Sequence, residues 1–198
     1  MGTISASMVK QLREQTGAGM MDCKEALTGC DGDMEKAVDF LRKKGLAKAA
    51  KRAGRETAEG IIDSYIHMGG KIGVMVEVNC ESDFVAKTDD FKAFARNIAL
   101  HIAATNPAGI EPEDVSEAVI ERERQVYREQ VLEMGKPANM VDKIVEGKIK
   151  KFFQDVCLMN QAYVKDPNIT IRDYMNETVA KIGESIRIRR FVRFQLGE

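Results

Sequence analysis

The chain has 198 residues, of which 44% are hydrophobic, so it can form one compact domain with a small appendage or two modest domains. Its 30 basic and 31 acidic residues give a net charge of -1, which favours neither a nucleic acid nor an anionic membrane as a partner. No apolar run approaches the roughly 20 residues of a membrane span, and the N-terminus lacks a secretory signal, so we expect a cytoplasmic protein.

The four cysteines, Cys23, Cys30, Cys80 and Cys157, match neither the spacing of a zinc site nor that of a disulfide framework. We expect reduced, mostly buried thiols. Phosphate-loop, dinucleotide-binding, nucleophile-elbow and H-E-x-x-H motifs do not occur in the sequence. Because no catalytic constellation can be assembled from these residues, we expect neither a cofactor nor a metal.

Residues 5–45 carry three apolar stripes at helical spacing, which predict three short helices. Gly17 and Gly19 allow a sharp reversal after the first helix, and Asp33 has the side chain of an N-cap for the third. Gly45 is a suitable residue to end that third helix. Because so short a segment buries little apolar surface, this module should be only marginally stable.

Met20 and Met21 open the second of these helices. Adjacent residues on a helix point in different directions, so either one methionine stays outside as a soft contact surface or both are partly buried. A basic, alanine-rich stretch follows at residues 46–59, and we interpret it as a solvated helical linker. We place the boundary there, between an N-terminal domain (residues 1–55) and a core domain (residues 56–198).

The sequence period changes from helical to alternating at Gly60. Residues 61–74 are predicted to form two strands around a Met-Gly-Gly turn, in which the glycines supply positive φ. The second strand continues to Val78, and a helix is predicted at residues 89–105.

Asp83 and Phe84 lie on the connection between that strand and that helix. Connections run over the surface and carry function more often than packing, so a large aromatic beside carboxylates is unusual there. Two interpretations are open. Phe84 either folds back as the lid of a small core or points outward.

Two longer helices, at residues 116–134 and 138–158, should pack as an antiparallel helical hairpin. A last helix begins near Thr170 and stops at Gly183, and a strand follows at residues 185–196. This strand and the β-hairpin should share one sheet. The expected fold class is therefore α+β, with an antiparallel-sheet core and packed helices.

The C-terminal strand combines apolar and basic side chains. One parity, with Arg190 as its single break, contains Ile186, Ile188, Val192, Phe194 and Leu196. Its arginines, three of them on one face, are interpreted as protection of an edge strand. His101, on the helix at residues 89–105, is either a hydrogen-bonded structural group or a ligand.

Residues 12–27, LREQTGAGMMDCKEAL, and residues 77–87, EVNCESDFVAK, are the most distinctive stretches. They resemble the two signature motifs of the bacterial elongation factor Ts family, and the similarity continues over the whole chain. Ser82 replaces the threonine that usually precedes Asp-Phe, which removes a methyl group and keeps a hydroxyl. The chain is similar to the short form of the family, without the duplicated core of long members.

The resemblance implies an N-terminal ubiquitin-associated-like domain and guanine-nucleotide exchange on elongation factor Tu in its GDP form, without bond-making chemistry. Phe84 would act as a wedge between helices of the GTPase, and Asp83 would disturb the groups that position Mg²⁺. Ser82 and Val85 complete this motif. A rival function is a helical protein-binding adaptor that uses residues 5–45 and has no exchange activity.

A second docking surface is expected on energetic grounds. Release that is faster by about four decades needs roughly 5.5 kcal/mol, at about 1.4 kcal/mol per decade. One buried aromatic contributes only about 1.5–3 kcal/mol. The expected docking residues are Arg13, Met20, Met21 and Lys24 from the N-terminal module and His101 from the core.

The short form also implies a homodimer, in which two subunits supply what the duplication supplies in one chain. The sequence does not determine whether Cys80 or Cys157 crosslinks the subunits. A last alternative is an enzyme that uses Cys80 beside Glu81 and Asp83. Those carboxylates should raise the pKa of the thiol and so oppose its activation.

Overall fold

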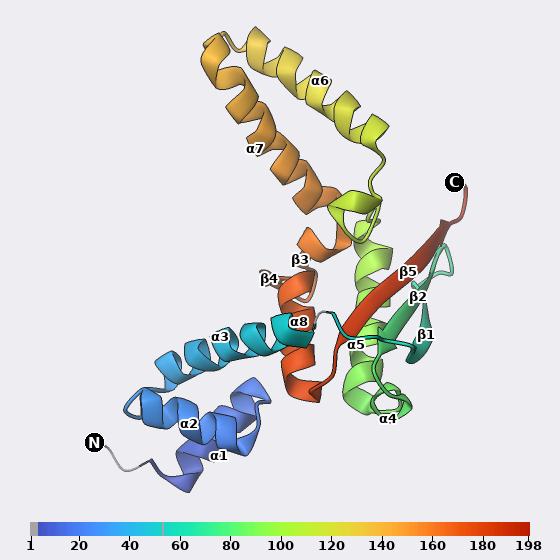
Figure 1. Cartoon of the computed structure of the whole chain (residues 1–198). Helices are drawn as coiled ribbons and strands as arrows, with labels where there is room; N and C mark the ends of the chain where they lie inside the picture. Colours follow the sequence, from blue (N-terminus) through green and yellow to red (C-terminus); the bar gives the residue numbers. More distant parts are fainter. Residues whose placement is uncertain (1–3, 53) are drawn as a thin grey trace. The chain divides into compact units, whose positions relative to one another are not determined.

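The computed structural model describes residues 4–52 and 54–198 (Figure 1). The chain divides into two compact units, each built from segments that are distant in sequence. The first comprises Met1–Asp63, Val76–Arg96 and Asp173–Arg189, and the second comprises Ser64–Met75, Asn97–Arg172 and Arg190–Glu198. The domain boundary placed near residue 55 stays a prediction. Within the described ranges, no helix is both long and apolar enough to cross a membrane.

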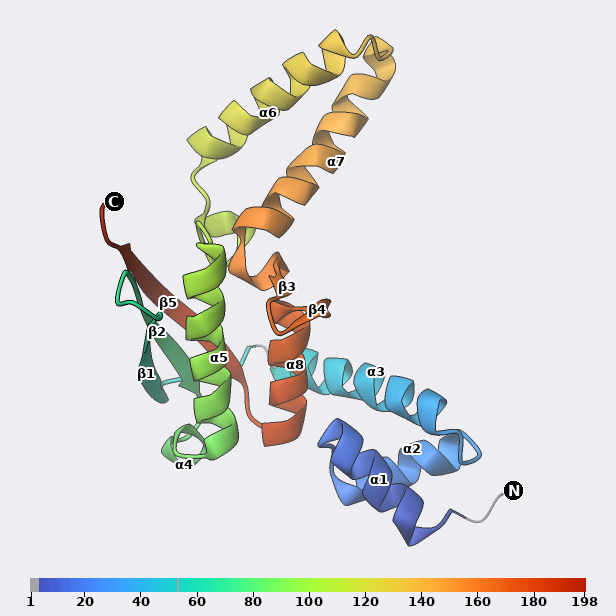
Figure 2. The same ribbon diagram turned by 180° about the vertical axis from the view of Figure 1, so that it is seen from behind.

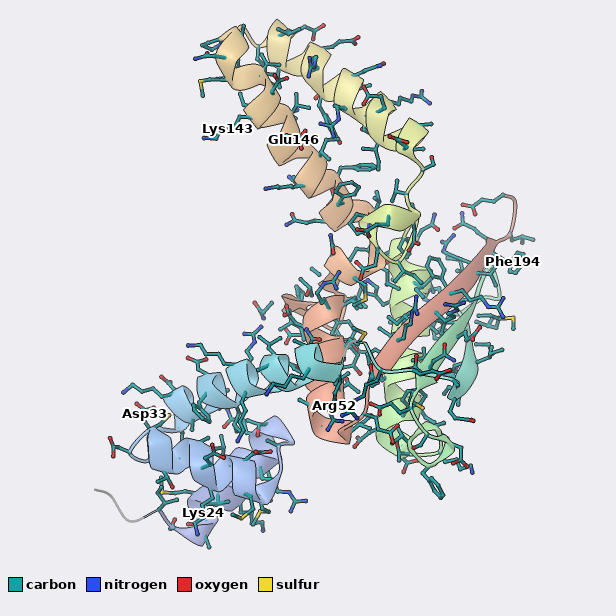
Figure 3. All side chains as sticks on the ribbon, in the orientation of Figure 1. Lys24, Asp33, Arg52, Lys143, Glu146 and Phe194 are labelled. Carbon is teal, nitrogen blue, oxygen red and sulfur yellow. The ribbon has the colours of Figure 1, made fainter. Side chains whose placement is uncertain are left out.

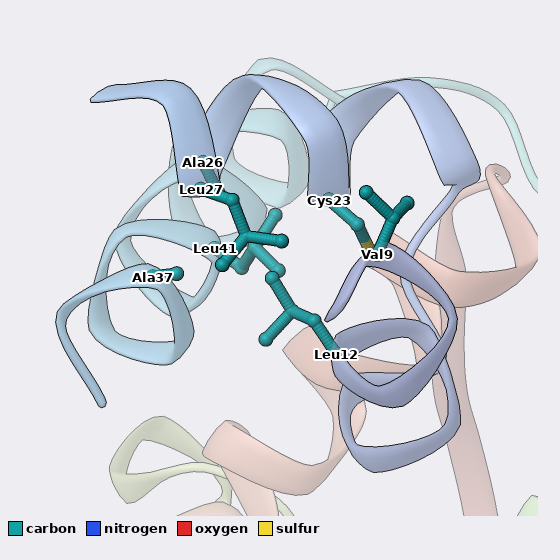
Figure 4. Close-up of a cluster of buried hydrophobic side chains, with 7 residues drawn as sticks. All are labelled: Val9, Leu12, Cys23, Ala26, Leu27, Ala37 and Leu41. Atoms are coloured by element: carbon teal, nitrogen blue, oxygen red, sulfur yellow. The ribbon is translucent and has the colours of Figure 1, made fainter. Parts of the chain in front are cut away.

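Three helices near the N-terminus pack around a small apolar core, as predicted. They are α1 (Ala6–Thr16), α2 (Met20–Gly29) and α3 (Met34–Arg52). The buried side chains of this core are Val9, Leu12, Cys23, Ala26, Leu27, Ala37 and Leu41 (Figure 4). The chain reverses at Gly17, whose φ is 66°. The Asp33 carboxylate accepts a hydrogen bond from Lys36 N at 3.1 Å, which confirms it as a cap of α3.

The third helix does not end at Gly45, and that prediction is wrong. α3 continues to Arg52, and residue 53 of the predicted linker lies outside the described residues. A methyl group on Gly45 would lie 3.1 Å from the Cβ of Ala180, on α8 (Ile171–Ile182). Gly45 therefore allows a close approach of two helices and does not act as a helix terminator.

A three-stranded sheet has the order β1-β2-β5, which confirms the predicted union of the hairpin with the C-terminal strand. The strands are β1 (Glu59–Ile66), β2 (Ile72–Cys80) and β5 (Ile186–Gln195). Leu196 N donates to the Lys71 carbonyl at 2.8 Å, and Ser185 N donates to the Glu81 carboxylate at 2.7 Å. β5 therefore runs antiparallel to β2, and the fold is α+β.

The alternation of burial along β5 is interrupted near Arg189, so the single predicted parity is wrong. Ile188 is buried as expected, but Phe194 is 67% exposed. The Arg193 side chain is only 8% exposed, and its Nε donates to the Ala103 carbonyl at 3.4 Å. Beyond Arg190 the partly buried side chains are Phe191 and Arg193, which have the other parity. Arg193 therefore does not belong to a solvated basic face.

The remaining helices belong to the connections between the strands. They are α4 (Asp83–Ala86), α5 (Asp89–Thr105), α6 (Glu117–Glu133) and α7 (Ala138–Val156), with single 3₁₀ turns at Pro112–Asp114 and Leu158–Asn160. α6 and α7 lie side by side as the predicted hairpin (Figures 1 and 2), around a core of Val131, Val141, Val145 and Ile149. The short pair β3 (Ala162–Tyr163) and β4 (Asp166–Thr170) was not predicted.

Candidate functional site

The corner after β2 contains the single-turn helix α4, which the sequence pattern did not predict. Ser82 is its N-cap, with extended backbone, and its Oγ accepts a hydrogen bond from Val85 N at 3.4 Å. Thr88 Oγ1 donates to the Val85 carbonyl at 2.8 Å and accepts from Phe91 N at 3.3 Å. These bonds connect α4 to the start of α5, so the corner has a defined conformation.

Phe84 points outward from this corner, with 78% of its surface exposed. The interpretation of Phe84 as the lid of a small core is therefore wrong. Ala86 and Phe91 supply the buried packing of this segment instead. A large aromatic that is held in solvent by a rigid scaffold is typical of a surface that binds another protein.

Lys87 connects the two central residues of the corner. Its Nζ lies 2.6 Å from Asp83 Oδ2 and 5.8 Å from the centroid of the Phe84 ring, within the range of a cation–π contact. The hydrogen bond between the two charged groups lowers the pKa of Asp83 and raises the pKa of Lys87. Asp83 is therefore ionised at neutral pH, with its charge partly balanced by a neighbour.

Two glutamates within the first unit hold the backbone around Ser82. The carboxylate of Glu184 accepts from Ser82 Oγ at 2.7 Å and from Ser82 N at 3.0 Å. The carboxylate of Glu81 accepts from Ser185 N at 2.7 Å and from Arg55 Nη1 at 3.0 Å. The bond from Ser185, followed by that from Arg55, lowers the pKa of Glu81. Glu184 was not among the predicted site residues, because no local pattern links it to a residue 102 positions earlier.

Four of the expected docking residues lie at the surface of the first unit. Arg13 and Lys24 are exposed, and Figure 3 labels Lys24 on the N-terminal helices. Met20 is 47% exposed and Met21 is 75% exposed, so both methionines lie outside the helical core. Their role in docking stays a prediction.

His101 is fully buried in the second unit. Its Nε2 lies 2.9 Å from Gln161 Oε1, and its Nδ1 accepts from Val164 N at 3.3 Å. Because Nδ1 accepts a backbone N–H, the ring is neutral and Nε2 is its donor. Burial lowers the pKa of His101 and so favours this neutral form. These contacts confirm the structural interpretation of His101, and its ring offers no surface to a partner in this conformation.

Cys80 is buried below the corner, and its Sγ donates to the Ser82 carbonyl at 3.2 Å. Burial raises the pKa of this thiol to about 11, which opposes its use as a nucleophile. All four cysteines are free thiols. Among the residues that the structure describes, no group of three or more His, Cys, Asp or Glu side chains could hold a metal ion.

The α+β fold and the exposed aromatic and acidic corner indicate a protein that binds another protein through its surface. A family model described as elongation factor TS matches residues 42–198. Elongation factor Ts of Desulfosudis oleivorans is 82% identical over 198 residues, which cover 100% of both chains. Elongation factor Ts of Carboxydothermus hydrogenoformans is 61% identical over 98% of this chain and 90% of its own. The chain belongs to the elongation factor Ts family.

Proposed function

We propose that this chain is a guanine-nucleotide exchange factor, which binds elongation factor Tu in its GDP form and promotes GDP release during translation elongation in the cytoplasm. Family membership supports the choice of partner. The exposed ring of Phe84 is the observation that carries the mechanism. The protein breaks no covalent bond and needs no cofactor. This chain and the nucleotide both bind elongation factor Tu, and the coupling between two ligands of one protein is reciprocal. A nucleotide that binds elongation factor Tu again therefore weakens the binding of this chain and releases it for another round.

Phe84 is proposed to enter between helices of the GTPase, while Asp83 disturbs the groups that position Mg²⁺. A GTPase holds GDP through Mg²⁺ and through backbone N–H groups of its phosphate loop. Once the ion is displaced, the phosphate charge is uncompensated and the nucleotide leaves. Because Phe84 is already exposed, the hydrophobic core of this chain need not open for the ring to reach the partner. Asp83 gives up only a solvent-exposed pair with Lys87, which water and salt screen.

A second contact is proposed on the N-terminal helices, at Arg13, Met20, Met21 and Lys24. Methionine side chains adapt to an irregular partner surface, and the flanking cations can find acidic partners. Both methionines are exposed although the core of these helices is complete without them. This contact would contribute the part of the binding free energy that one aromatic cannot supply.

We further propose a homodimer that forms through the sheet face of the second unit. The pairing of Leu196 with Lys71 places Phe194 opposite Gly73 and Val192 opposite Met75, on one face. The exposed apolar side chains of this part of the second unit are Met75, Val192 and Phe194 on β2 and β5, Ile66 at the end of β1, Met68 in the hairpin turn and Leu196 just after β5. An apolar patch on an edge strand is a liability in a monomer, and a second copy would cover it.

The exchange proposal is tested by the release of a fluorescent GDP analogue from elongation factor Tu at increasing concentrations of this protein. The intact chain should accelerate release by orders of magnitude, whereas Phe84→Ala should lose most of the maximal rate. Phe40→Ala, which removes another exposed phenylalanine, on α3, should retain it. An unchanged maximal rate in Phe84→Ala would refute the wedge. Binding without any acceleration by the intact chain would favour the adaptor alternative.

A further inference from the structure

We infer that Glu184 is a positioning residue for the exchange corner, an inference that rests on the proposed function. Glu184 holds Ser82, and through Ser82 it holds the turn of helix that carries Asp83 and Phe84. It acts on the exchange reaction through this contact and not by touching the partner.

The Ser82 hydroxyl is placed by the hydrogen bonds that it makes. A hydroxyl has one hydrogen to donate and two lone pairs to accept with. Ser82 Oγ uses its hydrogen toward Glu184 at 2.7 Å, which turns its lone pairs toward Val85 N, 3.4 Å away. The charged carboxylate therefore orients the hydroxyl as an acceptor for α4, and each bond polarises the next.

Helix α4 depends on this cap more than a longer helix would. A helix of one turn fixes several backbone dihedrals for very few hydrogen bonds, so it has little stability of its own. Its apolar anchor is small, since Ala86 is the buried residue of the turn and Phe84 faces solvent. The conformation that presents Phe84 therefore depends on hydrogen bonds at both ends of the turn, those of Ser82 at its start and those of Thr88 at its end.

Glu184 is itself held in place. It follows Gly183, whose φ of 87° ends α8 and turns the chain toward β5. The next residue, Ser185, donates its N–H to Glu81, which directly precedes Ser82. The hydrogen bonds between the two segments are thus reciprocal, because each glutamate accepts from the backbone N–H of the serine in the other segment. This reciprocal arrangement limits the positions that Glu184 can adopt.

Loss of the contact should change binding and maximal rate differently. If the corner is correctly ordered only part of the time, the apparent affinity falls by that fraction, whereas the bound complex is unaltered. Glu184→Ala should therefore raise the half-saturating concentration for GDP release about tenfold, the range expected for a lost cap, with the maximal rate close to that of the intact chain. Phe84→Ala should instead lower the maximal rate.

The experiment compares Glu184→Ala, Glu184→Gln, Ser82→Ala and the double variant Ser82→Ala/Glu184→Ala in the GDP-release titration. Glutamine keeps the size of the side chain but has a single acceptor oxygen, so it should give an intermediate shift. The effect of the double variant should be smaller than the sum of the two single effects, because both single changes remove the hydrogen bond between Ser82 Oγ and Glu184. Ser82→Thr, which keeps the hydroxyl, should behave like the intact chain.

The matched control is Asp90→Asn, which removes the negative charge from the 2.6 Å ion pair of Asp90 with Lys181 on α8 and leaves Ser82 and Glu184 untouched. It should keep the half-saturating concentration. Additive effects of the two alanine changes, or a lowered maximal rate with an unchanged half-saturating concentration, would overturn the inference.

Hydrogen exchange at Val85 N provides a readout without the GTPase. Faster exchange in Glu184→Ala would support the positioning role even if the intact chain failed to release GDP, and unchanged protection would overturn it.

Discussion

Phe84 on α4 and Phe94 on α5 lie on successive helices and have opposite surroundings. Phe94 is fully buried, and the centroid of its ring lies 5.2 Å from that of Tyr174. Most of the Phe84 surface faces solvent. A ring contributes to the free energy of folding only where it leaves water. Phe94 therefore contributes to the stability of the fold, whereas the ring of Phe84 is available to a partner.

Replacing each phenylalanine by alanine should have unequal effects on stability. Phe94→Ala should lower the free energy of unfolding by about 3–5 kcal/mol, because it leaves a cavity in the core. Phe84→Ala should change it by no more than about 0.5 kcal/mol, as expected for an exposed side chain. Urea denaturation followed by circular dichroism measures both. A comparable loss in the two variants would contradict the outward position of Phe84.

Gly60 should be irreplaceable, whereas Gly147 should not. Gly60 has a φ of 148°, and a Cβ there would lie 2.2 Å from the Val78 carbonyl oxygen. Gly60→Ala should therefore destabilise the protein by more than about 1 kcal/mol. Gly147 lies within α7, and a methyl group added to it would meet no atom within 4 Å beyond its chain neighbours and the backbone of its own helix, so Gly147→Ala should stabilise by roughly 0.5–1 kcal/mol. Denaturation midpoints that move in the same direction would disprove this contrast.

The Glu81 carboxylate should stabilise the fold at neutral pH and make that stability sensitive to acid. Its pKa is lowered from the usual 4.5 by the Ser185 N–H and the Arg55 guanidinium, so its contribution is complete above the unfolded pKa. That contribution is lost as the pH falls through the lower, folded-state pKa. Glu81→Gln should therefore lose less stability than the intact chain between about pH 7 and about pH 3. Urea midpoints across this range test it, with the exposed Glu133→Gln as control. Identical pH profiles for Glu81→Gln and the intact chain would contradict the assignment.

The buried thiols should resist alkylation while the protein is folded. Burial raises the pKa of Cys80 and of Cys157 to about 11, so little of either thiol is ionised at neutral pH. Cys30 is only partly buried and should react with iodoacetamide first. Mass spectrometry of the folded protein over time gives the order of labelling, and labelling in urea gives the control. Rapid modification of Cys80 would restore the enzyme alternative and allow a crosslink between subunits.

Phe194→Glu should separate the proposed dimer. A charge at the centre of the apolar sheet face of the second unit cannot be buried against a second copy without a partner. Size-exclusion chromatography with light scattering should give twice the chain mass of 22.1 kDa for the intact protein and a single chain mass for the variant. Leu132→Glu, which charges another exposed apolar side chain, on α6, should remain dimeric. A monomeric mass for the intact chain would refute the dimer.

Local patterns predicted most of the secondary structure. α5 begins at Asp89 and ends at Thr105 as expected, and the helical hairpin, the glycine turn and the C-terminal strand lie where the sequence placed them. These elements are long and strongly periodic, so the side-chain pattern alone selects them. The pattern failed for α4, which is a single turn held by a cap, and for Gly45, whose role is set by a neighbouring helix.

The sequence by itself determined the motif at Ser82, Asp83 and Phe84, its place between a strand and a helix, and the α+β class. The tertiary structure decided that Phe84 faces solvent, that His101 is buried, and that Glu184 holds Ser82. Burial and hydrogen bonding depend on which distant segments meet. Residues 82 and 184 share no local pattern, so only the folded chain brings their side chains together.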